Sequence, residues 1–248
     1  MPPRDPSAGP KPGTYQQWRQ VQPDSVARVP VDRPMVALTF DDGPDPRYTR
    51  EVLRLLRAND ARATFFTIGV NAAAYPSFVH EVMADGHSIG NHTWNHRLLD
   101  SLTADEVAEE IDRCQAALAG VGAPTPHLFR PPKGFTAPDV GPAADRAGLR
   151  TVFWDECVEH LVDHQDLEVG VVELLGRAQP GSIILAHDGG AVVGSPRRPL
   201  SRERTIAALP SLLSGLRSLG LEVVDVPTLM KVGRVPMAPG HPDPDLLR

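Results

Sequence analysis

Strand-like and helix-like segments alternate along this chain from residue 36 to residue 226, and this regular order constrains the fold more than any other feature. Each apolar run that reads as a buried strand precedes a segment with helical periodicity. Such alternation is typical of a parallel sheet with helices outside it, and about seven repeats in one domain favour a barrel over an open sheet. We therefore predict an α/β fold with about seven parallel strands.

The predicted strands are short apolar runs at 36–40, 63–69, 88–90, 127–129, 151–154, 182–186 and 222–226. The predicted helices lie between them, at 49–57, through 78–83, from 104 onward, and at 139–148, 169–178 and 205–219. Thr103 followed by Glu106 predicts a capping box at the start of the third helix.

The two ends of the chain differ from this repeating part because they are rich in proline and poor in apolar residues. We predict a loosely attached arm over 1–34, which Tyr15 and Trp18 pin to the body, a folded domain over 35–230, and a fraying tail over 231–248. The start of the chain has no apolar export signal, so the protein as written is expected in the cytoplasm. If the sequence has been trimmed, the protein is expected to be secreted.

Composition excludes several functional classes. The net charge of −6 gives no support for general nucleic-acid binding. The chain has neither a G-x-G-x-x-G motif nor a Walker loop, so nucleotide binding has no support, and no apolar run approaches the length of a membrane span. Two cysteines permit at most one internal disulfide.

Two adjacent carboxylates, Asp41 and Asp42, follow the first predicted strand, and Gly43 and Pro44 then break it. In α/β folds the carboxyl ends of strands are where chemistry takes place. One carboxylate can bind a metal ion while the other acts as a general base. The alternative is an ordinary turn, which also favours Asp, Gly and Pro.

His92 and His96 are spaced at i and i+4, so on a helical turn both imidazoles face the same way and can bind one metal ion. Asp42 is the natural third ligand because it ends a neighbouring strand. Two imidazoles and one carboxylate leave positions open for water and substrate. The alternative is a pair of surface histidines.

Two further residues follow predicted strands. His187 comes after the strand at 182–186, where it can act as a general acid; the alternative is a structural histidine. Arg130 comes after the strand at 127–129, where it can pair with Asp41 and keep that carboxylate ionised; the alternative is a surface arginine.

Four motifs occur in a fixed order: Thr-Phe-Asp-Asp-Gly-Pro at 39–44, His-Thr-x-x-His at 92–96, Arg-Pro-Pro at 130–132 and Leu-Ala-His at 185–187. Together they resemble the NodB-homology polysaccharide deacetylases, the carbohydrate esterases of family four, over residues 36–226. The resemblance implies a distorted, incomplete (β/α) barrel. It also implies a divalent metal, most often zinc with cobalt, manganese or nickel as alternatives, that activates water to remove acetyl groups from N-acetylated sugars.

The resemblance also implies roles for individual residues. Asp41 is the general base, Arg130 orients it, and His187 protonates the leaving amine. The metal ligands are Asp42, His92 and His96. The backbone N–H of Lys133 is a second donor to the oxyanion, and the expected substrate contacts are Lys133, Pro131, Trp154 and Leu185. No organic cofactor is expected.

The sequence departs from the family pattern in three places. Lys133 stands where the family usually has Tyr or Phe. The acidic partner expected for His187 falls near Cys157, so Asp155, Glu156 and Glu159 are the candidates to replace it. The segment 191–204 looks long and carries several arginines, which with Lys133 could bind an anionic group; the alternative is a solvated loop. These arginines are Arg197, Arg198, Arg202 and Arg204.

The sequence therefore predicts a metal-dependent hydrolase that removes an N-acyl group from an N-acetylated sugar or polysaccharide. Two alternatives remain. One is a cytosolic deacylase of a small, anionic biosynthetic amide, because no export signal is visible. The other is an inactive barrel that binds carbohydrate without turnover.

Overall fold

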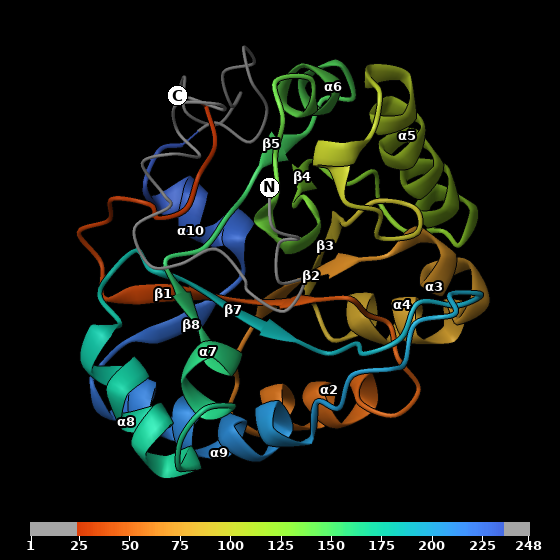
Figure 1. Cartoon of the computed structure of the whole chain (residues 1–248). Coiled ribbons are helices and arrows are strands. Elements are labelled where there is room, and N and C mark those ends of the chain that lie inside the picture. Colours follow the sequence, from red (N-terminus) through yellow and green to blue (C-terminus); the bar gives the residue numbers. More distant parts are fainter. Residues whose placement is uncertain (1–23, 236–248) are drawn as a thin grey trace, which may run out of the picture.

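The computed structural model describes residues 24–235, in which all strands lie in one parallel sheet that curls into an incomplete barrel (Figure 1). The strand order is β5-β4-β3-β2-β1-β7-β6, and β8 pairs with the start of β1. Within the described residues β5 and β6 do not pair with each other, so the barrel stays open there. The predicted incomplete (β/α) barrel is confirmed. The strands are β1 Met35–Asp41, β2 Ala63–Thr67, β3 Ser88–Asn91, β4 Leu128–Phe129, β5 Arg150–Thr151, β6 Glu156–Cys157, β7 Ile183–His187 and β8 Glu222–Val224.

The helices cover the outside of this sheet, and Figure 1 shows α2, α8 and α9 together on one side of it. Both halves of the predicted capping box between Thr103 and Glu106 are present at the start of α5. Helices α3, α7 and α10 were not predicted; each spans only five to seven residues, too few to give a clear helical period. The helices are α2 Thr49–Ala58, α3 Gly69–Ala74, α4 Pro76–Ala84, α5 Ala104–Gly120, α6 Val140–Arg146, α7 Val158–Val162, α8 Leu167–Arg177, α9 Glu203–Ser218 and α10 Val226–Val232, with short 3₁₀ turns at Leu99–Ser101 and Pro132–Gly134.

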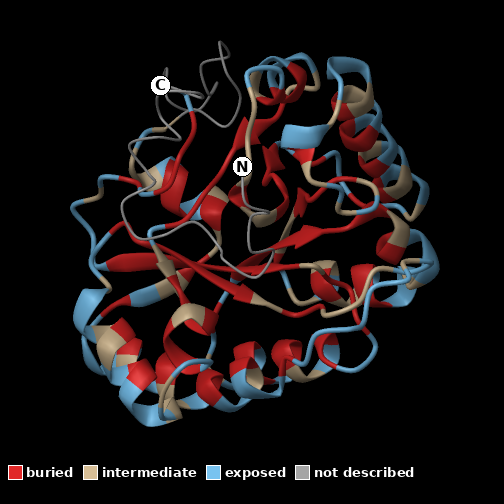
Figure 2. Ribbon diagram, viewed as in Figure 1, coloured by how far each residue is buried: buried red, intermediate tan, exposed pale blue. Residues whose placement is uncertain are grey.

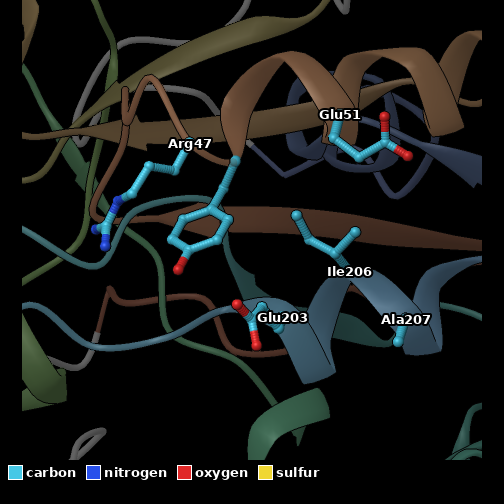
Figure 3. A pocket seen from close by; sticks show the side chains of 6 residues that line it. Arg47, Glu51, Glu203, Ile206 and Ala207 are labelled. Carbon is cyan, nitrogen blue, oxygen red and sulfur yellow. The ribbon is translucent and has the colours of Figure 1, made fainter.

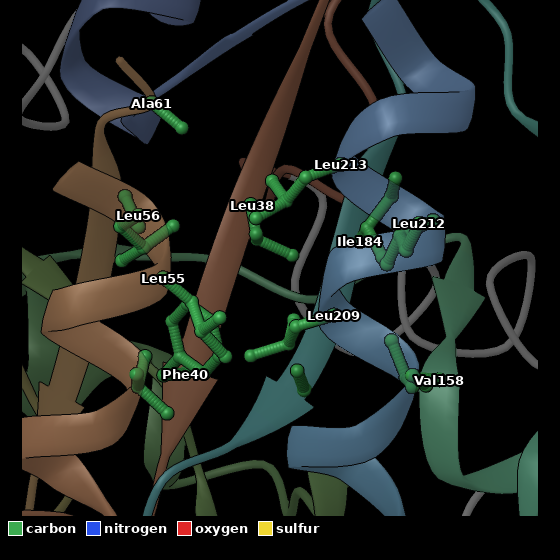
Figure 4. Close-up of a cluster of buried hydrophobic side chains, with 14 of the residues drawn as sticks. Leu38, Phe40, Leu55, Leu56, Ala61, Val158, Ile184, Leu209, Leu212 and Leu213 are labelled. Atoms are coloured by element: carbon green, nitrogen blue, oxygen red, sulfur yellow. The ribbon is translucent and has the colours of Figure 1, made fainter. Parts of the chain in front are cut away.

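Strand β1 has two buried faces, which fix the direction of its last residue. Leu38 and Phe40 pack against α2 and α9 in the outer core (Figure 4), whereas Ala37 belongs to the inner core. Because side chains alternate along a strand, Asp41 also faces the interior. A one-residue slip would reverse this arrangement, and burying one Leu or Phe stabilises the fold by about 1.5–3 kcal/mol. Apolar burial therefore aims Asp41 into the barrel.

The segment 24–34 is part of the folded body, so the prediction of a loose arm is wrong for these residues. Val26 and Val29 are 6% and 0% exposed, and Val26 forms a parallel bridge with Val152. The N–H of Val29 donates to the carbonyl of Gly181. This segment is held in place because its short apolar run packs into the inner core. Figure 2 shows that the interior of the barrel is buried. Tyr15 and Trp18 lie outside the described residues.

At the other end α10 continues to Val232, and Val235 packs against the inner core. The predicted tail therefore begins later than residue 231, and its remainder from 236 lies outside the described residues. Within residues 24–235, no helix combines the length and the apolar character needed to cross a membrane.

Candidate active site

The predicted catalytic residues meet at the carboxyl ends of the parallel strands. Asp41 and His187 are the last residues of β1 and β7, and they are partners in the register of these two strands. His92 follows β3, and Arg130 follows β4. The sheet thus brings together four side chains that are up to 146 positions apart in the sequence, from Asp41 to His187.

Arg130 is fully buried and holds Asp41 in place. Its Nη1 donates to Asp41 Oδ1 at 2.8 Å and to Thr39 Oγ1 at 2.8 Å. Nε and Nη2 donate to the carbonyls of Val152 and Phe153, both at 3.0 Å. A buried guanidinium is tolerated only when such partners compensate its lost hydration. The structure therefore brings Arg130 and Asp41 together as the sequence indicated.

Asp42, His92 and His96 form a cluster in which one possible ligand atom from each residue lies within 4.8 Å of the others. The Nε2 atoms of His92 and His96 lie 3.5 Å and 3.2 Å from Asp42 Oδ1, respectively. His92 Nδ1 lies 2.7 Å from the carbonyl oxygen of Arg130. A carbonyl only accepts, so Nδ1 carries the proton and the lone pair of Nε2 faces the cluster.

The chemistry of this cluster fits a divalent metal ion. Asp42 Oδ1 is buried and makes no hydrogen bond of good geometry within residues 24–235. Burial opposes ionisation of Asp42, but His96 and His92 outweigh it and hold the pKa of this carboxyl well below its usual value. An ionised carboxylate and imidazole nitrogens are the donors that zinc and related metals prefer.

The two histidines are not on a helical turn, which corrects the prediction from their spacing. Residues 92–96 form a loop in which Thr93 and His96 adopt positive φ angles of 68° and 60°. Side chains hold this backbone: Asn91 Oδ1 accepts from the N–H of Thr93, and Thr93 Oγ1 accepts from the N–H of His96. The side-chain hydrogen bonds of Asn91 and Thr93 therefore replace the helical period that we expected.

His187 pairs with Glu159, one of the three acidic residues that the sequence left open. Nδ1 of His187 lies 3.1 Å from Oε1 of Glu159, which also accepts from Thr205 Oγ1 at 2.7 Å. Burial opposes ionisation of Glu159, but His187 outweighs it and lowers the pKa of Glu159 to about 2. Asp155 instead accepts from Ser182 and the N–H of Ile183.

Arg202 approaches the cluster from the segment 191–204. Its Nη2 donates to Asp42 Oδ2 at 3.0 Å, and its Nε donates to the carbonyl of Gly189 at 2.7 Å. Arg204 bonds the carbonyls of Val162 and Gln165. Two of the four arginines that we considered for binding an anionic group are therefore bound within the protein, whereas Arg197 and Arg198 are exposed, and contact of this segment with a substrate stays a prediction. No sequence motif marked Arg202.

Asp188 is a second buried carboxyl beside His187, and sequence reasoning missed it. Its Oδ2 accepts from Thr49 Oγ1 at 2.6 Å. Burial, with smaller contributions from nearby carboxylates, raises the pKa of Asp188 to about 7. A Cβ at position 43 would lie 2.3 Å from Asp188 Oδ2, so Gly43 leaves the space that this side chain fills.

The predicted substrate contacts come from three places: the turn after Arg130, the segment after β5, and strand β7. Lys133 lies in the turn Pro132–Gly134 with a φ of 57°, and the N–H of Gly134 donates to the carbonyl of Pro131. The Trp154 ring centre is 5.3 Å from the Arg130 guanidinium carbon, and Leu185 is buried in the inner core. Contact of Lys133, Pro131, Trp154 and Leu185 with a substrate stays a prediction.

A separate pocket of about 510 Å³ lies between the start of α2 and α9 (Figure 3). Its lining residues are Arg47, Tyr48, Glu51, Glu203, Ile206 and Ala207, none of which belongs to the predicted site.

An incomplete (β/α) barrel with carboxylates and imidazoles at the carboxyl ends of its strands is the architecture of the NodB-type carbohydrate esterases. The chain belongs to the polysaccharide deacetylase family, whose model matches residues 28–152. This family comprises hydrolases of non-peptide carbon–nitrogen bonds in sugars and is in general metal-dependent. The resemblance seen in the sequence is thereby confirmed.

Similar proteins are known in several bacteria. The chain is 38% identical over 211 residues to a peptidoglycan-N-acetylglucosamine deacetylase of Bacillus cereus, covering 82% of this chain and 91% of that protein. It is 36% identical over 211 residues to a chitooligosaccharide deacetylase of Azorhizobium caulinodans, covering 81% and 97%. A crystal structure of a peptidoglycan N-acetylglucosamine deacetylase matches with a TM-score of 0.75 at 28% identity, covering 86% and 95%.

Proposed function

We propose that this protein removes the N-acetyl group from N-acetylglucosamine units of a polysaccharide or oligosaccharide, with a divalent metal ion, zinc first among them. The observation that carries the proposal is the arrangement at the ends of β1 and β7. The Arg130-bound carboxylate of Asp41 lies beside the Asp42–His92–His96 cluster and opposite His187. Relatives named as deacetylases of peptidoglycan and of chitooligosaccharides support this substrate class.

A metal ion held by Asp42, His92 and His96 would polarise the acetyl carbonyl and lower the pKa of a water molecule. Asp41 is the group that takes the proton of the attacking water. Its Oδ1 accepts from Arg130, so Oδ2, which lies 3.7 Å from His92 Nε2, is the oxygen that faces the cluster. The buried guanidinium orients the Asp41 carboxylate, as a general base requires.

His187 is the group that gives a proton to the departing amine. Nδ1 of His187 lies 3.1 Å from the Glu159 carboxylate, so Nε2 is the nitrogen left to act on the substrate. The backbone N–H of Lys133 remains our proposed second donor to the oxyanion. Both groups act only when the scissile amide lies between the ends of β1 and β7.

The arginines of the segment 191–204 bear on the alternative of a small anionic substrate. Arg202 is buried, and both it and the exposed Arg204 donate to protein acceptors, so two of the four arginines are already engaged within the protein. This arrangement favours a neutral N-acetylated sugar. The complete set of ligand and proton-transfer residues favours an active enzyme over a barrel that only binds carbohydrate.

The test is acetate release by zinc-loaded protein from N-acetylglucosamine oligomers of several lengths, beside monomeric N-acetyl sugars. We expect release from oligomers that increases with chain length. Silence on every oligomer, with zinc bound, would contradict the proposal and support a small amide substrate instead. The matched control is Asp41→Asn, in which metal binding should persist while release stops.

A further inference from the structure

Arg202 links the chain segment after β7 to the carboxylate of Asp42, and none of the four family motifs contains this contact. The chain leaves β7 after His187, passes through the segment 188–201 and returns to the cluster at the start of α9. There the Arg202 side chain, 8% exposed, donates to Asp42 Oδ2, which is the carboxylate oxygen turned away from His92 and His96.

We propose that Arg202 is a positioning residue for the metal-binding carboxylate of Asp42. It occupies Oδ2, so that Oδ1 alone is presented to the two imidazole nitrogens. This inference rests on the proposed metal-dependent function, because it concerns the same cluster.

The backbone around Asp42 shows that this arrangement is held from several sides. Asp42 has a positive φ of 72°, and its carbonyl oxygen accepts from Asn71 Nδ2 at 3.0 Å. A Cβ at Gly189 would lie 2.1 Å from the same carbonyl oxygen, so the loop after β7 packs directly on Asp42. The Gly189 carbonyl in turn accepts from Arg202 Nε. The guanidinium is therefore fixed to the loop while it holds the carboxylate.

A carboxylate held at one oxygen behaves differently from a free one. Without Arg202, Asp42 could rotate or present both oxygens to a metal ion, and either change alters affinity and coordination. Partners that orient a metal ligand typically change metal affinity by 10–100-fold when they are removed. The pair is also largely buried, so salt screens it much less than a surface ion pair. Arg202 further helps to lower the pKa of Glu159, which places its charge near both sides of the site.

The experiment measures Zn²⁺ affinity by competition with a chelator in the wild-type protein and in Arg202→Gln, Arg202→Lys and Arg204→Gln. We expect 10–100-fold weaker binding in Arg202→Gln. Arg202→Lys should fall between it and wild type, because an amine can reach one acceptor but not reproduce the planar fork. Arg204→Gln is the matched control, since this neighbouring side chain bonds the carbonyls of Val162 and Gln165 and pairs with Asp163 rather than with Asp42, and its affinity should stay within about twofold of wild type.

The visible absorption spectrum of Co²⁺-loaded protein depends on the coordination of the metal, so it would not change if Arg202 only stabilised the fold. Weaker visible bands in Arg202→Gln are expected, because a second carboxylate oxygen would raise the coordination number. Thermal unfolding in the presence of EDTA separates loss of folding from loss of affinity, and Arg202→Lys remains usable if Arg202→Gln fails to fold.

Zn²⁺ affinity within twofold of wild type in both Arg202 variants, with an unchanged Co²⁺ spectrum, would overturn the inference while leaving the proposed deacetylation standing. Weakened affinity without acetate release from the wild-type enzyme would support the inference and contradict the proposed function. Absence of Zn²⁺ and Co²⁺ binding in the wild-type protein would overturn both.

Discussion

The two sides of the active site are built in different ways. On the side of the proposed base, Asp41 ends a seven-residue strand that pairs with β2, β7 and β8. On the side of the proposed acid, His187 depends on Glu159, which belongs to the five-residue helix α7 that follows the two-residue strand β6. The sheet therefore fixes the base, whereas a few side-chain contacts fix the partner of the acid. Changes on the first side should stop the reaction, and changes on the second should tune it.

The largest effect is expected for Asp41→Asn. The amide cannot accept the proton of the attacking water, so acetate release should fall by roughly 10³-fold, within the range that general bases contribute. Zinc stoichiometry should stay that of wild type, because the ligands Asp42, His92 and His96 are unchanged. Acetate release at the wild-type rate would refute Asp41 as the base.

Asp188→Asn tests a buried carboxyl that directly follows His187 and accepts from Thr49, and its effect falls on stability. The folded, metal-free chain holds the proton of Asp188 up to a pKa of about 7, whereas an unfolded Asp titrates near its ordinary value of 3.8. Stability is therefore lost as the pH rises from about 4 through about 7. Asp188→Asn should raise the free energy of unfolding at pH 8 by on the order of 4 kcal/mol and leave it nearly unchanged at pH 4. Urea unfolding at both pH values measures this, and equal gains at both would contradict the explanation.

Glu159→Gln tests the weaker side directly. We expect kcat to fall by roughly 10–100-fold, as for other partners that orient a functional imidazole, with zinc affinity unchanged. The contribution of Glu159 to stability depends on pH with the opposite sign to the contribution of Asp188. Glu159 has a folded pKa of about 2, below its ordinary value of 4.5, so its contribution is present above about pH 4.5 and is lost as the pH falls toward 2.

In urea unfolding experiments, Glu159→Gln should reduce the loss of stability that wild type shows as the pH falls from about 4.5 toward 2. An unaltered kcat would show that His187 needs no acidic partner. A fall in zinc affinity would mean instead that the two sides are not independent.

The smallest effect is expected for Lys133→Tyr, which restores the side chain that the family usually carries. Because the proposed oxyanion donor is the backbone N–H, turnover at saturation should change little. The KM for N-acetylglucosamine oligomers should fall a few-fold as an aromatic wall is added, on the order of 1 kcal/mol of stacking. A large loss of kcat would show that the Lys133 side chain itself takes part in the reaction.

Much of the fold and of the base side could be predicted because regular strands carry it. Alternation along β1 places Phe40 in the outer core and Asp41 in the interior, and the apolar run before His187 does the same for β7. The periodic spacing of apolar residues, which differs between strands and helices, is therefore enough to place Asp41 and His187 at the same edge of the sheet.

The remaining features depend on contacts that carry no period. Strand β6 has two residues, so the partner of His187 could only be narrowed to Asp155, Glu156 and Glu159. The loop that carries His92 and His96 is shaped by hydrogen bonds from Asn91 and Thr93, which spacing alone does not reveal. Arg202 reaches Asp42 across 160 positions of sequence.

The shared register of Asp41 and His187 has a consequence for altering this enzyme. Neighbouring strands lie about 4.8 Å apart, so the reach between the proposed proton acceptor and proton donor is a property of the backbone ladder between β1 and β7. Loops such as 131–138 can then be exchanged between homologues as separate modules for substrate choice. The pairing of β1 with β7 would keep the same spacing between Asp41 and His187 beneath each new loop.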